Sequence, residues 1–308
     1  MSHPSDAAAV AARRTGRRAV AERRRSVQLS EVTLDDGRVV MVKRADSDGT
    51  PGALRAEAAG LRWLAAAHAV AVPEVHGPDD GADDGADDGW LVLDRVAEGR
   101  ATADGARRFG RDLAVLHATG APEFGAPPPG GPTDAAIGLA PMRNVPGEEW
   151  PRWYAEHRVL PYVRLAVDGG TLTPAESRTI EQVLDRLPAL AGPAEPPARL
   201  HGDLWNGNVL WGPDGAAWLI DPAAHGGHRE TDLAMLHLFG APHLDRIVDG
   251  YQEAAPLADG WRDRVPLHQL FPLLVHTVLF GRGYAEQSLT AARRQLARYH
   301  ASTGVPGL

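Results

Sequence analysis

Two neighbouring stretches near the start of the chain carry the apolar pattern of strands. Residues 26–34 alternate between apolar and polar side chains, and residues 38–44 form an apolar run with Lys43 near its end. The acidic and glycine residues at 35–37 favour a tight turn between them. The pattern therefore predicts a β-hairpin that carries Lys43 on its second strand.

Most of the remaining chain has the apolar spacing of helices. Helices are expected at residues 7–25 in part, 51–67, 103–117, 150–165, 176–187, 230–238 and 244–298, the last interrupted at Pro256, Pro266 and Pro272. Short strands are expected at residues 90–93, 209–211 and 217–220, with an extended segment at 70–75. The turn residues 212–215 predict that the last two strands form a second hairpin.

These elements predict an α+β fold with two lobes. Residues 1–96 are expected to form a small N-lobe with an antiparallel sheet and a helix, and residues 97–308 are expected to form a mostly helical C-lobe. Three segments, 78–89, 121–132 and 188–197, are expected to lack regular structure. The first is a repeated acidic sequence, and the other two are rich in residues that break helices and strands.

Composition narrows the classes of protein to which these lobes can belong. The 308 residues carry a formal net charge of −8, which argues against general binding to nucleic acid or anionic membranes. The chain has no cysteine, so disulfides, thiolate nucleophiles and cysteine-ligated metals are excluded. Its start lacks the apolar core of a signal peptide, and residues 270–280 are too few to span a bilayer. We therefore expect a cytoplasmic protein, and its oligomeric state stays open.

The densest set of reactive side chains lies in residues 199–221. Asp203 is followed by Asn208 after five residues, and Asp221 comes thirteen residues later at the end of an apolar run. Phosphoryl transfer needs one carboxylate that accepts the proton of the attacking hydroxyl. It also needs an amide and a second carboxylate that hold Mg²⁺ on the nucleotide. The spacing predicts this chemistry, with the second hairpin bringing Asn208 close to Asp221.

Lys43 is the only lysine of the chain, against thirty-one arginines. A compact ammonium fits between phosphate oxygens where a planar guanidinium does not, so its retention favours a phosphate contact over survival by chance. Glu57 on the following helix is expected to pair with it, although a solvated glutamate is the ordinary alternative. The backbone at Asp94 and Val96 is expected to hold adenine. The chain departs from a kinase-type fold in one respect, because residues 20–34 contain no glycine. Glycines in such a lid let its backbone approach the phosphates closely.

The motifs together resemble those of fructosamine/ketosamine kinases, a branch of the protein-kinase-like superfamily that includes aminoglycoside phosphotransferases. The matching stretches are HGDLWNGN at 201–208, IDPAAHGGHRETDLAM at 220–235, LFG at 238–240, IGLAPMRN at 137–144, EHRVLP at 156–161 and LFPLLVHTVLFGRGY at 270–284. The resemblance covers most of residues 38–290 and is poor in residues 1–30. His225 also stands where an aromatic residue is common in the family. The resemblance implies a protein-kinase-like fold.

The resemblance also implies a role for each site residue. The catalytic base is Asp203, the Mg²⁺ ligands are Asn208 and Asp221, the ATP-positioning pair is Lys43 with Glu57, the structural supports are His201 and Asp232, and the substrate-side residues are Trp205, Asn144, Arg158, His228 and Glu230. Trp205 can stack on a sugar face, but a tryptophan is as often a packing residue.

The implied activity is ATP-dependent phosphorylation of the 3-hydroxyl of a ketosamine, whose product breaks down and releases the amine. The acceptor is a small ketosamine or a glycated protein lysine, and the sugar is not specified by the residues. A second interpretation keeps the chemistry and makes the acceptor an aminoglycoside or another amino alcohol. A third is an inactive kinase fold that only binds ligands.

An unrelated class, the binuclear metallophosphatases, shares the pairs Gly202-Asp203 and Gly207-Asn208. That class needs a histidine directly after the second pair, where this chain has Val209. It also needs an Asp-x-His sequence on its first strand, and no such sequence occurs here. The kinase interpretation is therefore preferred.

Overall fold

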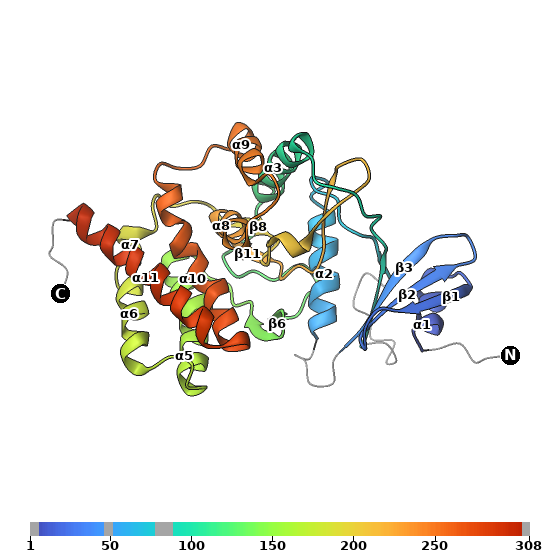
Figure 1. Cartoon of the computed structure of the whole chain (residues 1–308), viewed down its shortest axis with the longest axis horizontal. Coiled ribbons are helices and arrows are strands. Elements are labelled where there is room, and N and C mark those ends of the chain that lie inside the picture. Colours follow the sequence, from blue (N-terminus) through green and yellow to red (C-terminus); the bar gives the residue numbers. More distant parts are fainter. Residues whose placement is uncertain (1–5, 46–51, 78–88, 304–308) are drawn as a thin grey trace.

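A small antiparallel sheet stands beside a larger group of helices in the computed structural model, which describes residues 6–45, 52–77 and 89–303 (Figure 1). The sheet contains β1 (Ala19–Arg24), β2 (Leu29–Leu34), β3 (Val39–Arg44), β4 (Val75–His76) and β5 (Trp90–Asp94), in the order β1-β2-β3-β5-β4. All neighbouring strands are antiparallel. Two helices, α1 (Asp6–Thr15) and α2 (Ala53–Ala65), complete the N-lobe.

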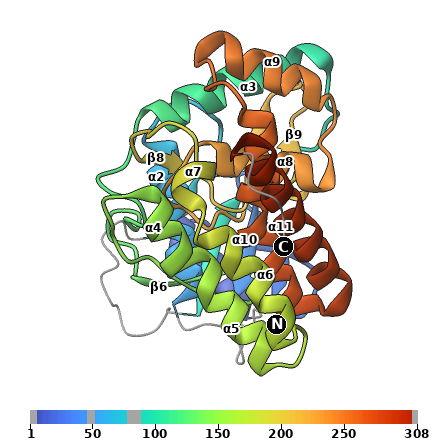
Figure 2. The ribbon, with the colours of Figure 1, turned by 90° about the vertical axis from the view of Figure 1, so that its left-hand side faces the viewer.

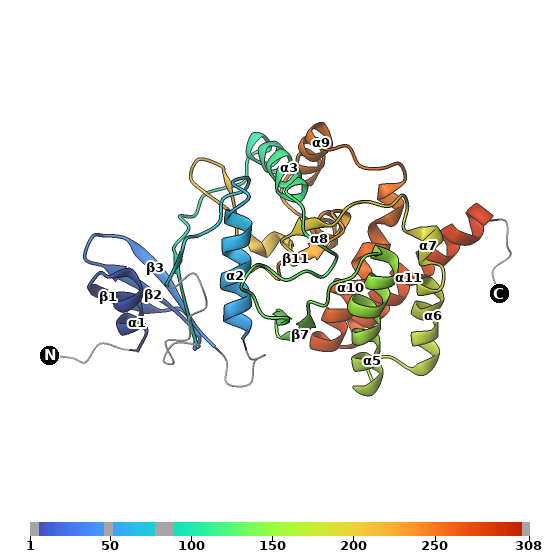
Figure 3. The same cartoon turned by 180° about the vertical axis from the view of Figure 1, so that it is seen from behind.

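The two faces of this sheet have different neighbours. Val40 and Val42 of β3 are buried in a cluster with residues of α1. Because side chains alternate along a strand, Met41 and Lys43 point to the opposite face, where Met41 packs with Leu61 of α2. Figure 3 shows α2 standing between the sheet and the helical lobe. The sheet therefore presents Lys43 toward the space between the two lobes.

The hairpin predicted around residues 35–37 is confirmed. β2 and β3 pair as expected, and the turn between them is closed by a bond from the N–H of Gly37 to the carbonyl of Leu34, 3.0 Å. Strand β1 was not predicted, because its sequence AVAERR does not alternate between apolar and polar side chains and five of its six residues are exposed. The acidic repeat at 78–88 lies outside the described residues.

The C-lobe is mostly helical, as expected. Its helices are α3 (Ala103–Ala118), α4 (Trp150–Tyr154), α5 (Leu160–Asp168), α6 (Pro174–Leu184), α7 (Leu187–Leu190), α8 (Glu230–Phe239), α9 (Leu244–Ala254), α10 (Trp261–Phe280) and α11 (Arg282–Thr303), with a π-helical turn, η1 (Ala155–Val159), and a 3₁₀ turn, η2 (Asn206–Asn208). Three two-stranded antiparallel sheets pair β6 (Asp134–Ile137) with β7 (Ala140–Arg143), β8 (Ala198–Leu200) with β11 (His225–Gly227), and β9 (Val209–Trp211) with β10 (Ala217–Leu219). The division at residues 96 and 97 stays a prediction.

Two helix pairs organise this lobe. Figure 2 shows α3 packed along α9 at one end, and α10 runs beside α11. The predicted pairing of residues 209–211 with 217–220 is confirmed by β9 and β10. Residues 188–197 are not wholly irregular, because α7 extends to Leu190. In the part of the chain that the structure describes, no helix has the length and apolar character needed to cross a membrane.

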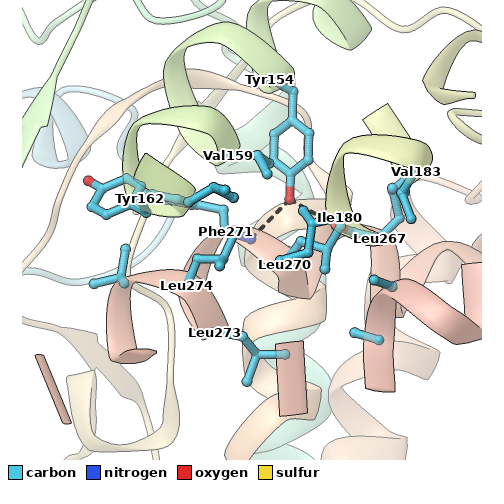
Figure 4. Packing of buried hydrophobic residues seen from close by; sticks show 14 of the residues in the cluster. Tyr154, Val159, Tyr162, Ile180, Val183, Leu267, Leu270, Phe271, Leu273 and Leu274 are labelled. Carbon is cyan, nitrogen blue, oxygen red and sulfur yellow. Dashed lines mark hydrogen bonds between the residues drawn. The ribbon is translucent and has the colours of Figure 1, made fainter. Parts of the chain in front are cut away.

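The expected interruptions at Pro266 and Pro272 are wrong, because α10 continues through both. A proline inside a helix leaves the carbonyl four residues earlier without its amide partner. For Pro272 that carbonyl belongs to His268, and the buried hydroxyl of Tyr154 lies 3.3 Å from it. The same hydroxyl donates to Leu267, 2.8 Å, and accepts from the N–H of Phe271, 3.2 Å (Figure 4). One tyrosine thus replaces the hydrogen bonds that the proline removes.

Candidate active site

The catalytic loop begins where β8 ends, and α8 holds its first turn. Asp232 of α8 is buried, and its carboxylate accepts the N–H of His201, 2.8 Å, and of Gly202, 3.0 Å. His201 in turn places its Nε2 2.9 Å from the carbonyl of Ile220. Gly202 has a φ of +83°, and a Cβ there would lie 2.1 Å from the carbonyl oxygen of Ala223. The loop conformation therefore requires glycine. The expected contact of Asp232 with the loop backbone is present, and its effect on catalysis stays a prediction.

Asp203 and Asn208 lie side by side after this turn. The Asn208 amide nitrogen donates to the Asp203 carboxylate, 3.1 Å, and to its backbone carbonyl, 2.9 Å. The same nitrogen is 3.4 Å from the carbonyl of Asp221. Burial raises the pKa of Asp203 to about 7, against the hydrogen bond from Asn208, which lowers it. A carboxylate with a pKa near neutrality can hold and release a proton at physiological pH.

Asp221 occupies a strained backbone position two residues after the end of β10. Its φ is +53°, in the left-handed region that residues with a Cβ seldom adopt. Its side chain is 47% exposed and faces Lys43. Strain of this kind costs on the order of 1–3 kcal/mol and persists where the surrounding structure imposes it, often at functional sites. The backbone therefore turns this carboxylate toward the N-lobe.

Lys43 links the two lobes. Its Nζ lies 2.6 Å from Glu57 of α2 and also forms an ion pair with Asp221. Burial favours the neutral amine, but the two carboxylates outweigh it, and the pKa of Lys43 is raised above its usual value. The ammonium is therefore charged at neutral pH and held at the mouth of the catalytic loop. The structure brings together the five residues to which the sequence assigned phosphate, base and metal roles.

The donor set fits a hard divalent cation. The amide nitrogen of Asn208 is used in bonds to Asp203, which leaves its oxygen as the group available to a ligand. The exposed carboxylate of Asp221 supplies further oxygen donors. Mg²⁺ prefers one or two protein oxygens together with phosphate and water oxygens. Asn208 and Asp221 are therefore suited to hold Mg²⁺ on a nucleotide.

Trp205 stands beside the catalytic loop with its indole folded over Gly207. A Cβ at Gly207 would lie only 2.2 Å from the indole ring, so the glycine makes room for it. The Phe239 ring meets the indole edge-on, with 5.9 Å between ring centroids. Trp205 is still 38% exposed. The ring is therefore supported on two sides and open to solvent, as a stacking surface requires. Sequence reasoning missed both supports, although the GN pair and the LFG stretch were visible.

Asn144 and Arg158 are buried and bind each other, and their expected contact with substrate stays a prediction. Each is 1% exposed. The Arg158 guanidinium donates to the Asn144 side-chain oxygen, 2.8 Å, and to the carbonyl of Arg143, 2.9 Å. It also lies 4.6 Å from the centre of the Trp153 ring. Burial lowers the pKa of Arg158 to about 10. Both side chains anchor the β6–β7 hairpin to η1.

His228 and Glu230 are buried as well, and their expected substrate role also stays a prediction. Each is 3% exposed. Both oxygens of Glu230 accept from Arg264 of α10, at 2.8 and 2.6 Å. Burial would raise the pKa of Glu230, but Arg264 and His268 hold it at about 2. Nδ1 of His228 accepts the N–H of Glu230, 3.2 Å. These residues join the start of α8 to α10 and present no surface to a ligand.

The expected adenine site and lid are less complete than the phosphate site. The Asp94 carboxylate is bound to His76, 2.6 Å, and Val96 follows the end of β5. Their contacts with adenine stay a prediction. The lid between β1 and β2 is closed by Arg24, whose guanidinium donates to the carbonyls of Ser26, 3.0 Å, and Val27, 3.2 Å. An arginine thus shapes the turn in this chain, which has no glycine there.

Comparison with known proteins agrees with this geometry. The family model for fructosamine kinase matches residues 8–298. A probable ketoamine kinase of Synechocystis is 35% identical over 238 residues, which cover 76% of this chain and 75% of that protein. A Thermobifida fusca structure assigned as a fructosamine-3-kinase is 50% identical and has a TM-score of 0.86. The match covers 95% of this chain and 99% of that chain.

More distant structures share the fold alone. An aminoglycoside phosphotransferase structure, a thermostable mutant in its ligand-free form, has a TM-score of 0.56 at 15% identity and covers 96% of this chain and 98% of its own. The protein-kinase-like fold expected from the sequence is therefore confirmed. The ketoamine kinase relatives and the fructosamine-3-kinase structure show that the chain is a phosphotransferase with a hydroxyl acceptor. By the match over nearly its whole length, the chain belongs to the fructosamine kinase family.

Proposed function

We propose that the chain transfers the γ-phosphoryl group of ATP to a hydroxyl of a ketosamine. The observation that carries this proposal is the cluster of Lys43, Asp203, Asn208 and Asp221 beside the half-open indole of Trp205. Membership of the fructosamine kinase family supports a ketosamine as acceptor. Use of ATP is supported by LicA, a chain of the same fold with a TM-score of 0.55, which was crystallised with AMP.

The residues divide the work of the transfer. Lys43, positioned by Glu57, binds the phosphates of the nucleotide. Asn208 and Asp221 hold Mg²⁺, which neutralises charge on the phosphates. Asp203 orients the acceptor hydroxyl and accepts its proton while the new oxygen–phosphorus bond forms and the bond to ADP breaks. Most of the acceleration comes from positioning and charge neutralisation, and the base adds about 10²–10⁴-fold.

Trp205 is proposed to stack on the sugar ring and so to place the hydroxyl against Asp203. The hydroxyl is the 3-hydroxyl of the ketose, and the phosphorylated product then breaks down and releases the amine. This would make the reaction a step of deglycation. The amine is a free small molecule or a lysine of a protein, and the sugar is fructose, ribulose or a shorter ketose. The buried residues Asn144, Arg158, His228 and Glu230 have no direct contact in this proposal.

The test is magnesium-dependent ATP consumption with fructose-lysine, ribulose-lysine and kanamycin as parallel acceptors. We expect turnover on at least one ketosamine, and the ratio of kcat/KM values then ranks the sugars. Turnover on kanamycin alone would contradict the proposal and would indicate that the acceptor is an aminoglycoside. ATP binding without turnover on any of the three would favour an inactive kinase fold. Asp203→Ala is the matched control, because it removes the base and leaves the indole in place.

A further inference from the structure

Aromatic side chains form a continuous line that begins at Trp205 and leads away from the catalytic loop. Phe239 at the end of α8 contacts Trp205, and His276 on α10 contacts Phe239, with ring centroids 5.9 and 5.2 Å apart. His276 also contacts Phe280 and Tyr284, at 5.4 and 4.9 Å. We call these five residues the aromatic shelf. Figure 1 shows α8, α10 and α11, the helices that carry its last four members, next to one another.

The shelf is exposed where the other aromatic residues are not. Among the described residues, three Phe, Tyr or Trp side chains are exposed, and all belong to the shelf: Trp205 at 38%, Phe239 at 39% and Phe280 at 65%. Single exposed apolar side chains are common, but a contiguous apolar patch marks a binding surface. A surface that starts at the proposed sugar-stacking residue is placed to bind what is attached to the sugar.

The chemistry of the shelf selects the class of group that it can bind. A ketosamine carries a secondary amine, which is protonated near neutral pH, and an organic substituent on that nitrogen. Aromatic faces attract such a cation by about 0.5–2 kcal/mol and bury apolar groups. Burial lowers the pKa of His276, so the imidazole adds no positive charge that would repel the amine. A flat apolar substituent therefore fits the shelf better than an anionic one.

We propose that the aromatic shelf is a specificity subsite for the amine substituent of the acceptor and favours aromatic or bulky apolar amines. This inference rests on the proposed function, because it places the sugar on Trp205. The sugar would lie between Asp203 and Trp205, and the substituent would extend over Phe239 toward Phe280. Phe280 is the position to test, since its 65% exposure means that truncation removes little packing.

The experiment compares two acceptors that share fructose and differ by one phenyl group, fructosyl-benzylamine and fructosyl-methylamine. The measured quantity is the ratio of their kcat/KM values. We expect the wild type to prefer the benzyl compound, and Phe280→Ala to lower the ratio about five- to tenfold, a loss typical of an aromatic contact. Phe280→Trp keeps an aromatic face and should keep the preference. Leu165→Ala, on α5 and 41% exposed, is the matched control and should change neither value.

The outcomes separate this inference from the proposed function. Phosphorylation of both acceptors with the same ratio in the wild type, Phe239→Ala and Phe280→Ala would overturn the shelf as a subsite and leave the kinase activity intact. Absence of ATP consumption with these two acceptors and also with fructose-lysine and ribulose-lysine would remove the proposed function and the inference with it. A dimer that Phe280→Ala converts to monomers without changing the ratio would assign the shelf to self-association instead, and light scattering distinguishes that case.

Discussion

Two clusters of charged residues in this chain both contain residues of the sequence motifs, but they differ in how far their side chains are exposed. The cleft cluster contains Lys43, Glu57 and Asp221, with side chains 21, 14 and 47% exposed. The core cluster contains Glu230 and Arg264, at 4 and 2%. Glu230 has both oxygens occupied by Arg264, whereas Asp221 sits in a strained, partly open position. A charged residue of a motif is a candidate for ligand binding when its side chain is partly exposed and its hydrogen-bonding groups are not all used within the protein.

The largest expected effect separates activity from folding at Asp203. Asp203→Asn removes the proton acceptor and should lower kcat about 10²–10⁴-fold. Folding should survive, because the buried carboxylate is replaced by a neutral group of the same shape. Kinetics with saturating ATP, together with thermal unfolding of the same variant, measure both properties. Near-normal turnover in the variant would contradict the assigned base.

The core cluster should behave in the opposite way. Glu230→Gln leaves Arg264 buried without its carboxylate, and the free energy of unfolding should fall by about 3–5 kcal/mol. Denaturant unfolding measures the loss. Glu253→Gln is the control, because it breaks an exposed pair with Arg107 and should have little effect. A stable Glu230→Gln variant that has lost activity would place Glu230 in the catalytic machinery after all.

Lys43→Arg sharpens the comparison within the cleft cluster. The charge is kept, but the guanidinium is broader than an ammonium and cannot sit in the same way between Glu57, Asp221 and phosphate oxygens. We expect kcat/KM for ATP to fall on the order of tenfold or more. Arg44→Lys, one residue later and exposed, makes the reverse exchange and should leave ATP use unchanged. Equal activity in both variants would argue that the single lysine survived by chance.

The smallest effect, measured over one pH unit, is a pH dependence of stability from Asp203. Its folded pKa of about 7 lies above the unfolded value near 3.9, so the folded state binds the extra proton between these values. This contribution to stability is complete below about pH 4 and is lost as the pH rises through about 7, with a slope of at most about 1.4 kcal/mol per pH unit. In metal-free buffer, Asp203→Asn should flatten this decline. Asp168→Asn, on the surface, should not.

Local sequence signals predicted the hairpins and most helices correctly. The turn residues at 35–37 and 212–215 carry their own conformational preference, and alternation or helical spacing identifies the flanking elements. Strand β1 was missed because its side chains are mostly solvent-exposed and its apolar residues do not alternate with polar ones. The effect of Pro272 on α10 was mispredicted because the compensating hydroxyl of Tyr154 comes from more than a hundred residues away.

The residues of the candidate site also differ in whether local sequence was sufficient to predict their positions. The spacing of Asp203, Asn208 and Asp221 depends on one loop and one hairpin, so the sequence was sufficient to bring them together. Lys43 and Glu57 needed the fold of the resembled family. The burial of Arg158 and Glu230 depends on helices packed from other parts of the chain, and no local pattern reports that. Membership of a sequence motif alone therefore did not distinguish buried residues that support the fold from exposed residues that a ligand can reach.

The ion pair between Lys43 and Asp221 spans the two lobes, and it has a consequence for how a nucleotide enters. In the ligand-free chain Lys43 is the counter-ion of both Asp221 and Glu57, so its ammonium is already neutralised before a nucleotide binds. A magnesium nucleotide brings a cation for the aspartate and anions for the lysine at the same time. Binding is then an exchange of partners in which neither Lys43 nor Asp221 is left without a counter-charge, and free nucleotide or free metal should bind much less readily than their complex.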